Sequence, residues 1–263
     1  MFKKELKSNL KLFLIVLGVL IGTFMMAYVV YPFAMDEETV KSLDDMMKMF
    51  PPELLKAFNM DNVSIATPYG WVKSEGFMLA LLGLAVYASI LGGIIVLKEE
   101  NNKTIEYLAT LPVKRSKILT VKILASFIYI VGIVVAFMLF NLLALIVLKE
   151  KIEGGFFLLS FSPLLLAVPF FFINLFISTL FKRNMKTIGI SLGLVFVSYF
   201  INLISQMSNK VEFFKYFSLY TLADTRYIIS DSKIHVLCIV ISLLIGAIFA
   251  VLSYVRYNRK ELV

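Results

Sequence analysis

Histidine and cysteine are nearly absent from this chain of 263 residues, which contains one of each, His235 and Cys238. A single cysteine excludes an intrachain disulfide, and a single histidine excludes the usual metal sites that need two imidazoles. No GxxxxGK[ST], HExxH or GxSxG stretch occurs, so the chain has no P-loop, zinc-protease or hydrolase motif. The sequence therefore predicts no catalytic residue, no metal ligand and no cofactor held by this chain itself.

Charged residues are missing from six long apolar runs. These are residues 12–33, 77–97, 123–148, 156–181, 187–207 and 234–255, none of which contains Asp, Glu, Lys or Arg. Each is long enough for a helix that crosses a bilayer core, which needs about 20 apolar residues. The alternating polarity of membrane β-barrels does not occur. We therefore expect an all-α polytopic membrane protein, with six spans in one transmembrane domain over 1–263.

The missing intramembrane charges also limit how such a protein could be powered. Carriers driven by protons or ions usually place carboxylates within their spans, and this chain has none there. The first apolar run is too long for the core of a signal peptide and is not followed by a small-residue cleavage site. We expect it to remain as the first span, and we expect any energy for transport to come from another protein.

Positive charge is concentrated on one side of the six expected spans. With an even number of spans both termini share a side, and that side carries 16 Lys and Arg against 10 on the other. Acidic residues divide in the opposite sense, 5 against 13. The positive-inside rule then predicts cytoplasmic termini. The many lysines, isoleucines and phenylalanines favour an AT-rich bacterial genome, so the plasma membrane of a bacterium is the expected location. Membrane topology and anionic lipid account for the net charge of +8, so no nucleic-acid partner is expected.

Two segments outside the spans have helical spacing of apolar residues. In residues 1–11, Phe2, Leu6 and Leu10 recur every four residues among lysines, which predicts an amphipathic helix on the inner face; a flexible basic tail is the alternative. Residues 34–76 form the largest outer segment. An apolar stripe there predicts a helix that Pro51 ends and a second helix after it, which either cover a pathway or rest on the membrane.

The polar residues inside the spans are uncharged and few. Asn202, Ser205 and Gln206 share one face of the fifth span, and we consider them with Tyr87 and Tyr199 as candidates for a substrate path. Interhelical hydrogen bonds are the plainer reading for all five. The pair Gly92-Gly93 would allow another helix to approach the second span closely. Pro163 and Pro169 are expected to kink the fourth.

The segment 98–122, between the second and third spans, combines acids at its start with bases at its end. Those charges suit the helix dipole and orient the protein in the membrane, so they alone need no partner. On a helix surrounded only by water, the apolar row Ile105, Leu108 and Leu111 would be exposed without an apolar partner. We therefore expect it to contact lipid or another protein. Pro112 is expected to end that helix, and Ser116 is a plausible N-cap for the next.

These residues resemble the signature of the type 2 ABC transporter permeases (ABC-2). The matching positions are Glu99-Glu100, Thr104-Ile105-Glu106, Leu108, Leu111-Pro112-Val113, Arg115, Ile118 and Lys122. One departure is Lys103, where the family commonly has Gly before the Thr. The resemblance covers nearly the whole chain, but its specific part is this cytoplasmic loop.

The resemblance implies a six-span half-transporter that pairs with a second permease, either the same chain or a paralogue. Two separate ATPase subunits would bind ATP and Mg and dock on the loop through its coupling helix. With the apolar row included, the expected ATPase-coupling residues are Glu99, Glu100, Thr104, Ile105, Glu106, Leu108, Leu111, Pro112 and Arg115.

The expected function is therefore that of a membrane permease subunit that exports a hydrophobic or amphipathic substrate. Uncharged spans and Met-rich outer helices favour an amphipathic peptide such as a bacteriocin or toxin, followed by a drug or lipid. A sensor or accessory membrane subunit that transports nothing is the alternative. An intramembrane enzyme is disfavoured because the chain has no catalytic constellation.

Overall fold

The computed structural model describes residues 2–34, 37–51, 55, 70, 72, 76–101, 113–150, 152, 155–181, 184–207, 209–224, 228 and 233–260. Within these ranges the regular structure is helical and no strand occurs. Six helical stretches are long and apolar enough to cross a membrane. They are formed by α1 (Phe2–Ala34), α5 (Phe77–Ile95), α8 (Arg115–Val147), α9 (Phe156–Phe161) with α10 (Pro163–Leu180), α11 (Asn184–Met207) and α13 (Val236–Arg259). The expected all-α fold with six spans is confirmed.

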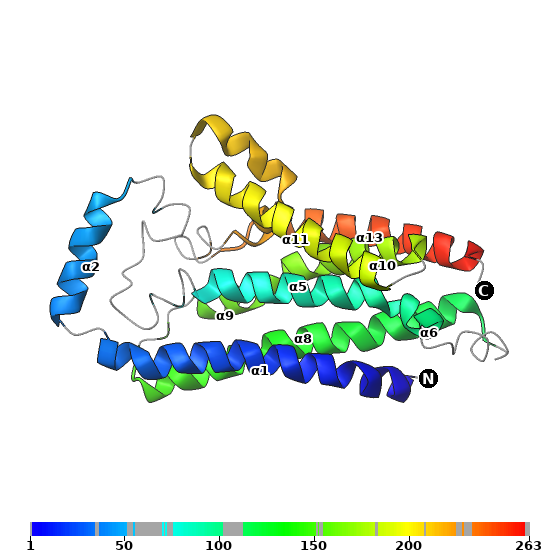
Figure 1. Cartoon of the computed structure of the whole chain (residues 1–263), viewed down its shortest axis with the longest axis horizontal. Helices are drawn as coiled ribbons and strands as arrows, with labels where there is room; N and C mark the ends of the chain where they lie inside the picture. Colours follow the sequence, from blue (N-terminus) through cyan, green and yellow to red (C-terminus); the bar gives the residue numbers. More distant parts are fainter. Residues whose placement is uncertain are drawn as a thin grey trace.

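The long helices run side by side as an elongated bundle (Figure 1). Both chain termini lie at one end of it, which we call the terminal end, and α2 (Glu37–Met49) lies at the opposite end, the α2 end. The short helix α6 (Leu97–Asn101) follows α5 at the terminal end. Two 3-10 helices, η2 (Asn209–Phe217) and η3 (Leu219–Ala223), follow α11.

Helix α1 differs from the separate surface helix expected over residues 1–11. Phe2 to Ala34 is one uninterrupted helix, which runs straight from the lysine-rich start into the first span. The reason lies in its buried polar residues: Glu5 and Asn9 are 6% and 5% exposed, while Lys3 and Lys7 point outward. Because Glu5 and Asn9 contact other helices of the bundle, the first three turns pack against protein and continue the span.

The third and fourth spans show two further boundary effects. Helix α8 begins at Arg115 with Lys114 at its N-cap, so Ser116 lies inside the helix and is not the expected cap. The fourth span breaks at Ser162 because Pro163 has no N–H for the helix ladder, and the Ser162 hydroxyl donates instead to the Leu159 carbonyl (2.9 Å). Pro169 lies within α10, which continues through it.

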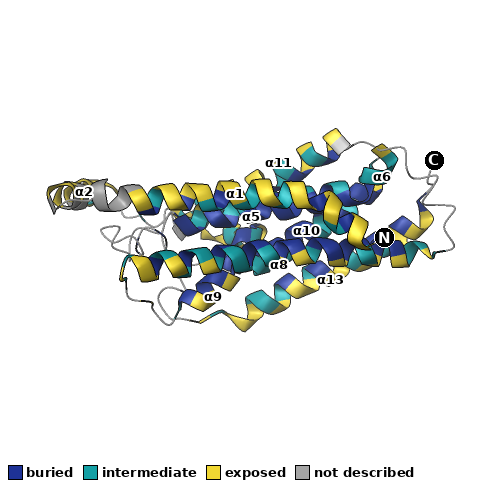
Figure 2. Ribbon diagram, turned by 90° about the horizontal axis from the view of Figure 1, so that it is seen from below, coloured by how far each residue is buried: buried dark blue, intermediate teal, exposed yellow. Residues whose placement is uncertain are grey.

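Helices α5 and α10 form the centre of the bundle. In the most apolar stretches of α5 and of the span formed by α9 and α10, 61% and 56% of the residues are buried, against 17% in α1 and in α13. Figure 2 shows the same contrast between the buried central helices and the exposed face of α1. Gly92 permits the contact between α5 and α10, since a Cβ there would lie 2.3 Å from the Phe171 carbonyl oxygen. The close approach expected at Gly92 is therefore present.

The α2 end is covered by short helices. Helix α2 ends at Met49, before Pro51, where the sequence predicts a stop. The second helix expected after Pro51 lies outside the described residues, apart from Leu55. The joint between η2 and η3 is fixed to α11, because the Ser218 hydroxyl donates to the Ser198 carbonyl (2.7 Å) and Leu219 N–H donates to the Ser198 hydroxyl (2.9 Å).

Candidate functional site

A buried ammonium group stands at the centre of a polar cluster at the terminal end. Lys122 of α8 is 1% exposed, and its Nζ donates to the Ile95 carbonyl at 3.1 Å. The same Nζ lies 3.1 Å from Glu5 Oε1 of α1 and also contacts the Glu99 carboxylate of α6. One lysine therefore links α1, α8 and the junction of α5 with α6.

Glu100, the neighbour of Glu99, has a different partner. Lys260, which follows α13, places its Nζ 2.7 Å from Glu100 Oε1 and donates to the Phe181 carbonyl at 3.1 Å. The Lys260 carbonyl in turn accepts from Arg115 Nη1 at 2.7 Å. The two adjacent carboxylates thus have different partners, Glu99 on α8, near α1, and Glu100 at the end of α13.

Further hydrogen bonds join the same helices near this cluster. Lys98 Nζ donates to Asn9 Oδ1 (2.8 Å), which gives α6 a second link to α1. The hydroxyls of Thr120 on α8 and Tyr254 on α13 lie 2.6 Å apart. The first turn after α5 and the first turns of α8 are therefore both fixed to the rest of the bundle.

Burial makes the charges of this cluster dependent on one another. Desolvation raises the pKa of the Glu99 carboxyl, and the Lys122 ammonium opposes that rise. Desolvation likewise lowers the pKa of the Lys98 ammonium, and the charge of Glu5 opposes that fall. Buried ion pairs of this kind add little net stability, but removing one partner is costly because the other charge stays buried.

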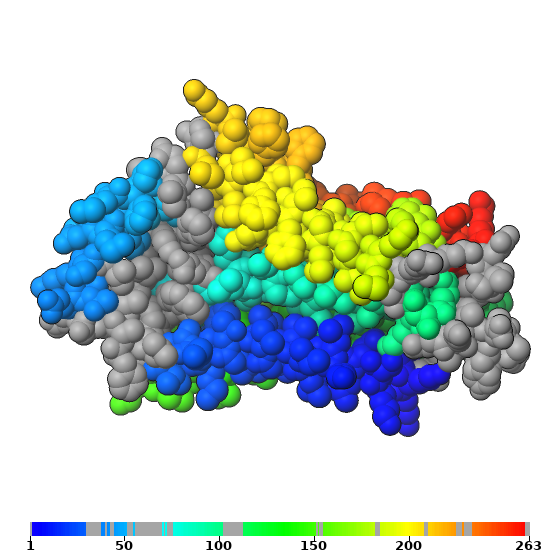
Figure 3. Space-filling view, viewed as in Figure 1, coloured from blue at the N-terminus to red at the C-terminus, as the bar shows by residue number. Residues whose placement is uncertain are grey.

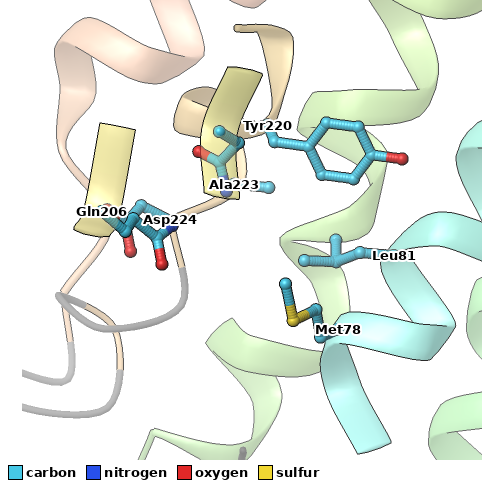
Figure 4. Close-up of a pocket in the computed structure, with 7 residues that line it drawn as sticks. Met78, Leu81, Gln206, Tyr220, Ala223 and Asp224 are labelled. Atoms are coloured by element: carbon cyan, nitrogen blue, oxygen red, sulfur yellow. The ribbon is translucent and has the colours of Figure 1, made fainter. Parts of the chain in front are cut away.

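A second polar site lies at the α2 end, where Figure 4 shows side chains from three segments around a small pocket. Its volume is about 20 Å³, which is room for about one water molecule. Asn202 and Gln206 of α11 contribute to it, as does Asp224 after η3. The remaining lining residues are Met78, Leu81, Tyr220 and Ala223.

The five residues considered for a substrate path do not form one continuous surface. Asn202 and Gln206 reach the pocket, and the Tyr199 ring packs on Tyr220, with centroids 5.5 Å apart. The Ser205 hydroxyl donates to the carbonyl of Asn202 in its own helix (2.7 Å) and does not line the pocket. Tyr87 is fully buried in the core of α5. Ser205 is thus bonded within its own helix and Tyr87 is buried in the core, and a role of the five residues in a substrate path stays a prediction.

The sequence matches a known family of membrane proteins. Residues 1–262 match the family model described as "ABC-2 family transporter protein". The chain belongs to the ABC-2 transporter family. It is therefore a multi-pass membrane protein and the permease component of an ABC transporter, a type of subunit that associates with an ABC ATPase. No curated protein and no solved structure gave a match.

Three of the expected ATPase-coupling residues of this ABC-2 permease are among the described residues, and all three lie at the terminal end. Glu99, Glu100 and Arg115 lie there together, each bound to another helix or to the end of the chain. Thr104, Ile105, Glu106, Leu108, Leu111 and Pro112 lie outside the described residues, so their predicted roles stay predictions.

Four members of the ABC-2 permease's cluster were not singled out from the sequence, namely Glu5, Asn9, Lys98 and Lys260. Each is distant in sequence from its partners, so no local spacing reveals the contact. One signal was present for Glu5, the only acidic residue among the four lysines of residues 1–11. An acid on a basic helix is a candidate for pairing with an interior cation. Within the described ranges, no group of His, Cys, Asp or Glu could hold a metal ion.

Proposed function

We propose that this ABC-2 permease is the membrane subunit of an exporter that moves a hydrophobic or amphipathic substrate outward. Separate ATPase subunits, two per complex, would bind and hydrolyse ATP with Mg. A second permease, the same chain or a paralogue, would complete the transmembrane part. The observation that supports this best is the way the ends of the loop segment 102–112 are attached to the bundle.

The described chain stops at Asn101 and resumes at Val113, and the residues on both sides of the segment 102–112 are anchored to the bundle. On the leaving side, Glu99 contacts Lys122 and Glu100 lies beside Lys260. On the returning side, Arg115 donates to the Lys260 carbonyl. A protein that binds the loop would therefore act on α1, α8 and α13 together, as a docked ATPase must do to drive transport.

The substrate class follows from what the spans contain. They have no charged residue within their apolar runs, so an ionic substrate would find no partner there. At the α2 end, Met46, Met49 and Phe50 expose apolar side chains on or next to α2, and Met adapts readily to irregular apolar partners. An amphipathic peptide such as a bacteriocin or toxin is the first candidate, ahead of a drug or a lipid.

Outward transport requires that the terminal end faces the cytoplasm, and labelling can establish this. In a Cys238→Ala background, Met49→Cys and Met185→Cys introduce highly exposed thiols at opposite ends, since the two methionines are 84% and 87% exposed. A charged maleimide that cannot cross the membrane of intact cells should label the cysteine at position 49 and not the one at 185. Permeabilised cells should show labelling of both. The reverse pattern in intact cells would contradict the proposed orientation.

Docking on the loop predicts a large loss of ATPase binding when its apolar row is made acidic. The triple variant Ile105→Asp/Glu106→Lys/Leu108→Asp should retain less than about a tenth of the co-purifying ATPase, because buried apolar anchors dominate such interfaces and exposed ion pairs contribute little. Membrane insertion should be unchanged. The measurement is the ratio of ATPase to permease after affinity purification from membranes.

A matched variant at the other end controls for general effects of these changes. Glu38→Lys/Met46→Asp/Met49→Asp makes the same changes of charge, two apolar residues to Asp and one Glu to Lys, at three exposed positions of α2. It should bind the ATPase at the wild-type level. Equal ATPase recovery from both triple variants would rule out docking through this loop.

A sensor or accessory subunit that transports nothing is the second candidate. It is favoured by one observation, the small size of the polar pocket at the α2 end, which has room for about one water molecule. Reconstitution with the ATPase in lipid vesicles separates the two functions. ATP-dependent movement of amphipathic peptides across the bilayer supports export, and ATP turnover without movement of any tested peptide, drug or lipid supports the accessory role.

A further inference from the structure

The helices fall into two groups according to their contacts. Helix α1 packs chiefly on α8, whereas α10 packs chiefly on α5 and α13, and α11 packs on α5. We call α1 and α8 the lateral pair, and α5, α10, α11 and α13 the central group. A helix of the lateral pair contacts any one helix of the central group far less extensively than α1 contacts α8. The boundary, which we call the seam, is visible in Figure 3 where α1 runs along α5.

The lateral pair is held together along its length. Near the terminal end Glu5 contacts Lys122, and the Tyr129 hydroxyl donates to the Leu6 carbonyl (2.5 Å). Toward the α2 end the Tyr28 hydroxyl donates to Asn141 Oδ1 (2.7 Å). Because hydrogen bonds join α1 and α8 near both ends of the pair, the two helices can move as one body.

Away from the terminal end, apolar side chains fill the seam. The ring of Phe127 on α8 packs against Phe171 and Phe172 of α10, with centroids 5.3 and 5.5 Å away. A cavity of about 10 Å³, at the lower limit for one water, also lies in the seam. It is lined by Leu20, Ala80, Leu84, Ile133, Val134, Phe137, Ser160 and Pro163. Apolar contacts are not directional, so this part of the seam does not fix one position of the pair.

Among the described residues, the directional contacts identified across the seam lie at the terminal end. The hydroxyls of Thr120 on α8 and Tyr254 on α13 form one of them, and Lys122 makes the most buried. From the lateral pair its Nζ reaches the Ile95 carbonyl and the Glu99 carboxylate, both on the segment that leads into the loop. Lys98 and Asn9 form a second link between this segment and α1. The seam is therefore apolar and adaptable over most of its length and fixed by polar bonds at one end.

We propose that Lys122 is a positioning residue that closes the seam at the terminal end and ties the lateral pair to the beginning of the loop. Movement of the loop then shifts α1 and α8 together against the central group. The proposal rests on the proposed function in one respect, namely that the docked ATPase is what moves the loop.

Two disulfide pairs test the role of Lys122, with Cys238→Ala to remove the only native thiol. Leu20→Cys/Gly83→Cys spans the seam, since a Cβ at Gly83 would lie 3.0 Å from Leu20 Cδ2 and 3.8 Å from Leu20 Cγ, which places the two residues in direct contact. Gly93→Cys/Ser191→Cys lies within the central group, where the two Cβ positions are 3.8 Å apart. This Cβ–Cβ separation of Gly93 and Ser191 is typical of a disulfide. Each pair is examined with wild-type Lys122 and in the uncharged variant Glu5→Gln/Glu99→Gln/Lys122→Met, which leaves no unpaired charge in the triad.

The uncharged variant should slow oxidation of the seam pair by about fivefold or more. Without Lys122 the position of the lateral pair against the central group varies more, and a disulfide forms only when the Cβ separation stays within a range of about 1 Å. The pair within the central group should oxidise at an unchanged rate. The measurement is the rate of disulfide formation in full-length chain in lipid vesicles, read from gel mobility. A role limited to general stability would slow both pairs equally, and that result, like an unchanged seam pair, would overturn the proposal.

Movement of the lateral pair is tested with the ATPase bound to the chain. Closing the seam disulfide should lower ATP turnover by about tenfold, and reduction by dithiothreitol should restore it, whereas the disulfide within the central group should leave turnover unchanged. Unaltered turnover with the seam closed would contradict movement of the lateral pair. If no ATPase binds the chain at all, the proposed function fails, and the oxidation rates still decide the role of Lys122.

Discussion

Lys122→Met should destabilise the folded chain by about 3–5 kcal/mol, among the largest effects expected from one substitution in this protein. The change removes the ammonium that lies between Glu5 and Glu99, whose side chains are 8% and 13% exposed. Two like charges then remain close together without a cation and with little access to water. The measurement is the free energy of unfolding of the purified chain in detergent, obtained by denaturant titration.

Neutralising the two carboxylates as well should recover most of that loss. In Glu5→Gln/Glu99→Gln/Lys122→Met no buried charge is left unpaired, and such replacements of buried ion clusters are often close to neutral in stability. As a control, Lys215→Met removes the cation of the exposed pair with Glu212 at the α2 end, and its effect should stay below about 1 kcal/mol. A Lys122→Met variant as stable as this control would show that the triad is not held as an ionised cluster.

The spans and several of their details could be predicted from the sequence because they depend on local properties. Charge-free runs of sufficient length specify membrane helices wherever they occur. The break at Pro163 follows from the missing N–H of one residue, and the close approach at Gly92 follows from a missing side chain. In each case the physical cause lies within a few residues of its effect.

The cluster at the terminal end could not be predicted in the same way. Glu5 and Lys122 are separated by 117 positions, and their contact depends on α1 packing beside α8. That contact also explains why residues 1–11 continue into the span and do not form a surface helix. The face shared by Asn202, Ser205 and Gln206 was correct as a helical pattern, but Ser205 satisfies its hydroxyl within its own helix. Side-chain partners depend on tertiary structure and not on spacing.

Gly92→Ala should also be strongly destabilising, for a reason unrelated to charge. The added Cβ would lie 2.3 Å from the Phe171 carbonyl oxygen and 3.0 Å from the Leu175 nitrogen. Both are backbone atoms of α10, so no change of rotamer can relieve the clash, and the two helices must separate. Overpacking of a well-packed core costs about 1–3 kcal/mol, and the rigid backbone places this variant at the upper end of that range.

Gly189→Ala provides the matched control, since it adds the same methyl group to α11 where no atom lies within 4 Å. Alanine is the better helix former, so this variant should be unchanged or more stable by about 0.5–1 kcal/mol. Denaturant titrations of the two purified variants in detergent measure the difference. If they are equally stable, α5 and α10 are not in direct backbone contact at Gly92. If only Gly92→Ala unfolds early, the close backbone contact of α5 with α10 contributes strongly to the stability of the central group, against which α1 and α8 are proposed to move.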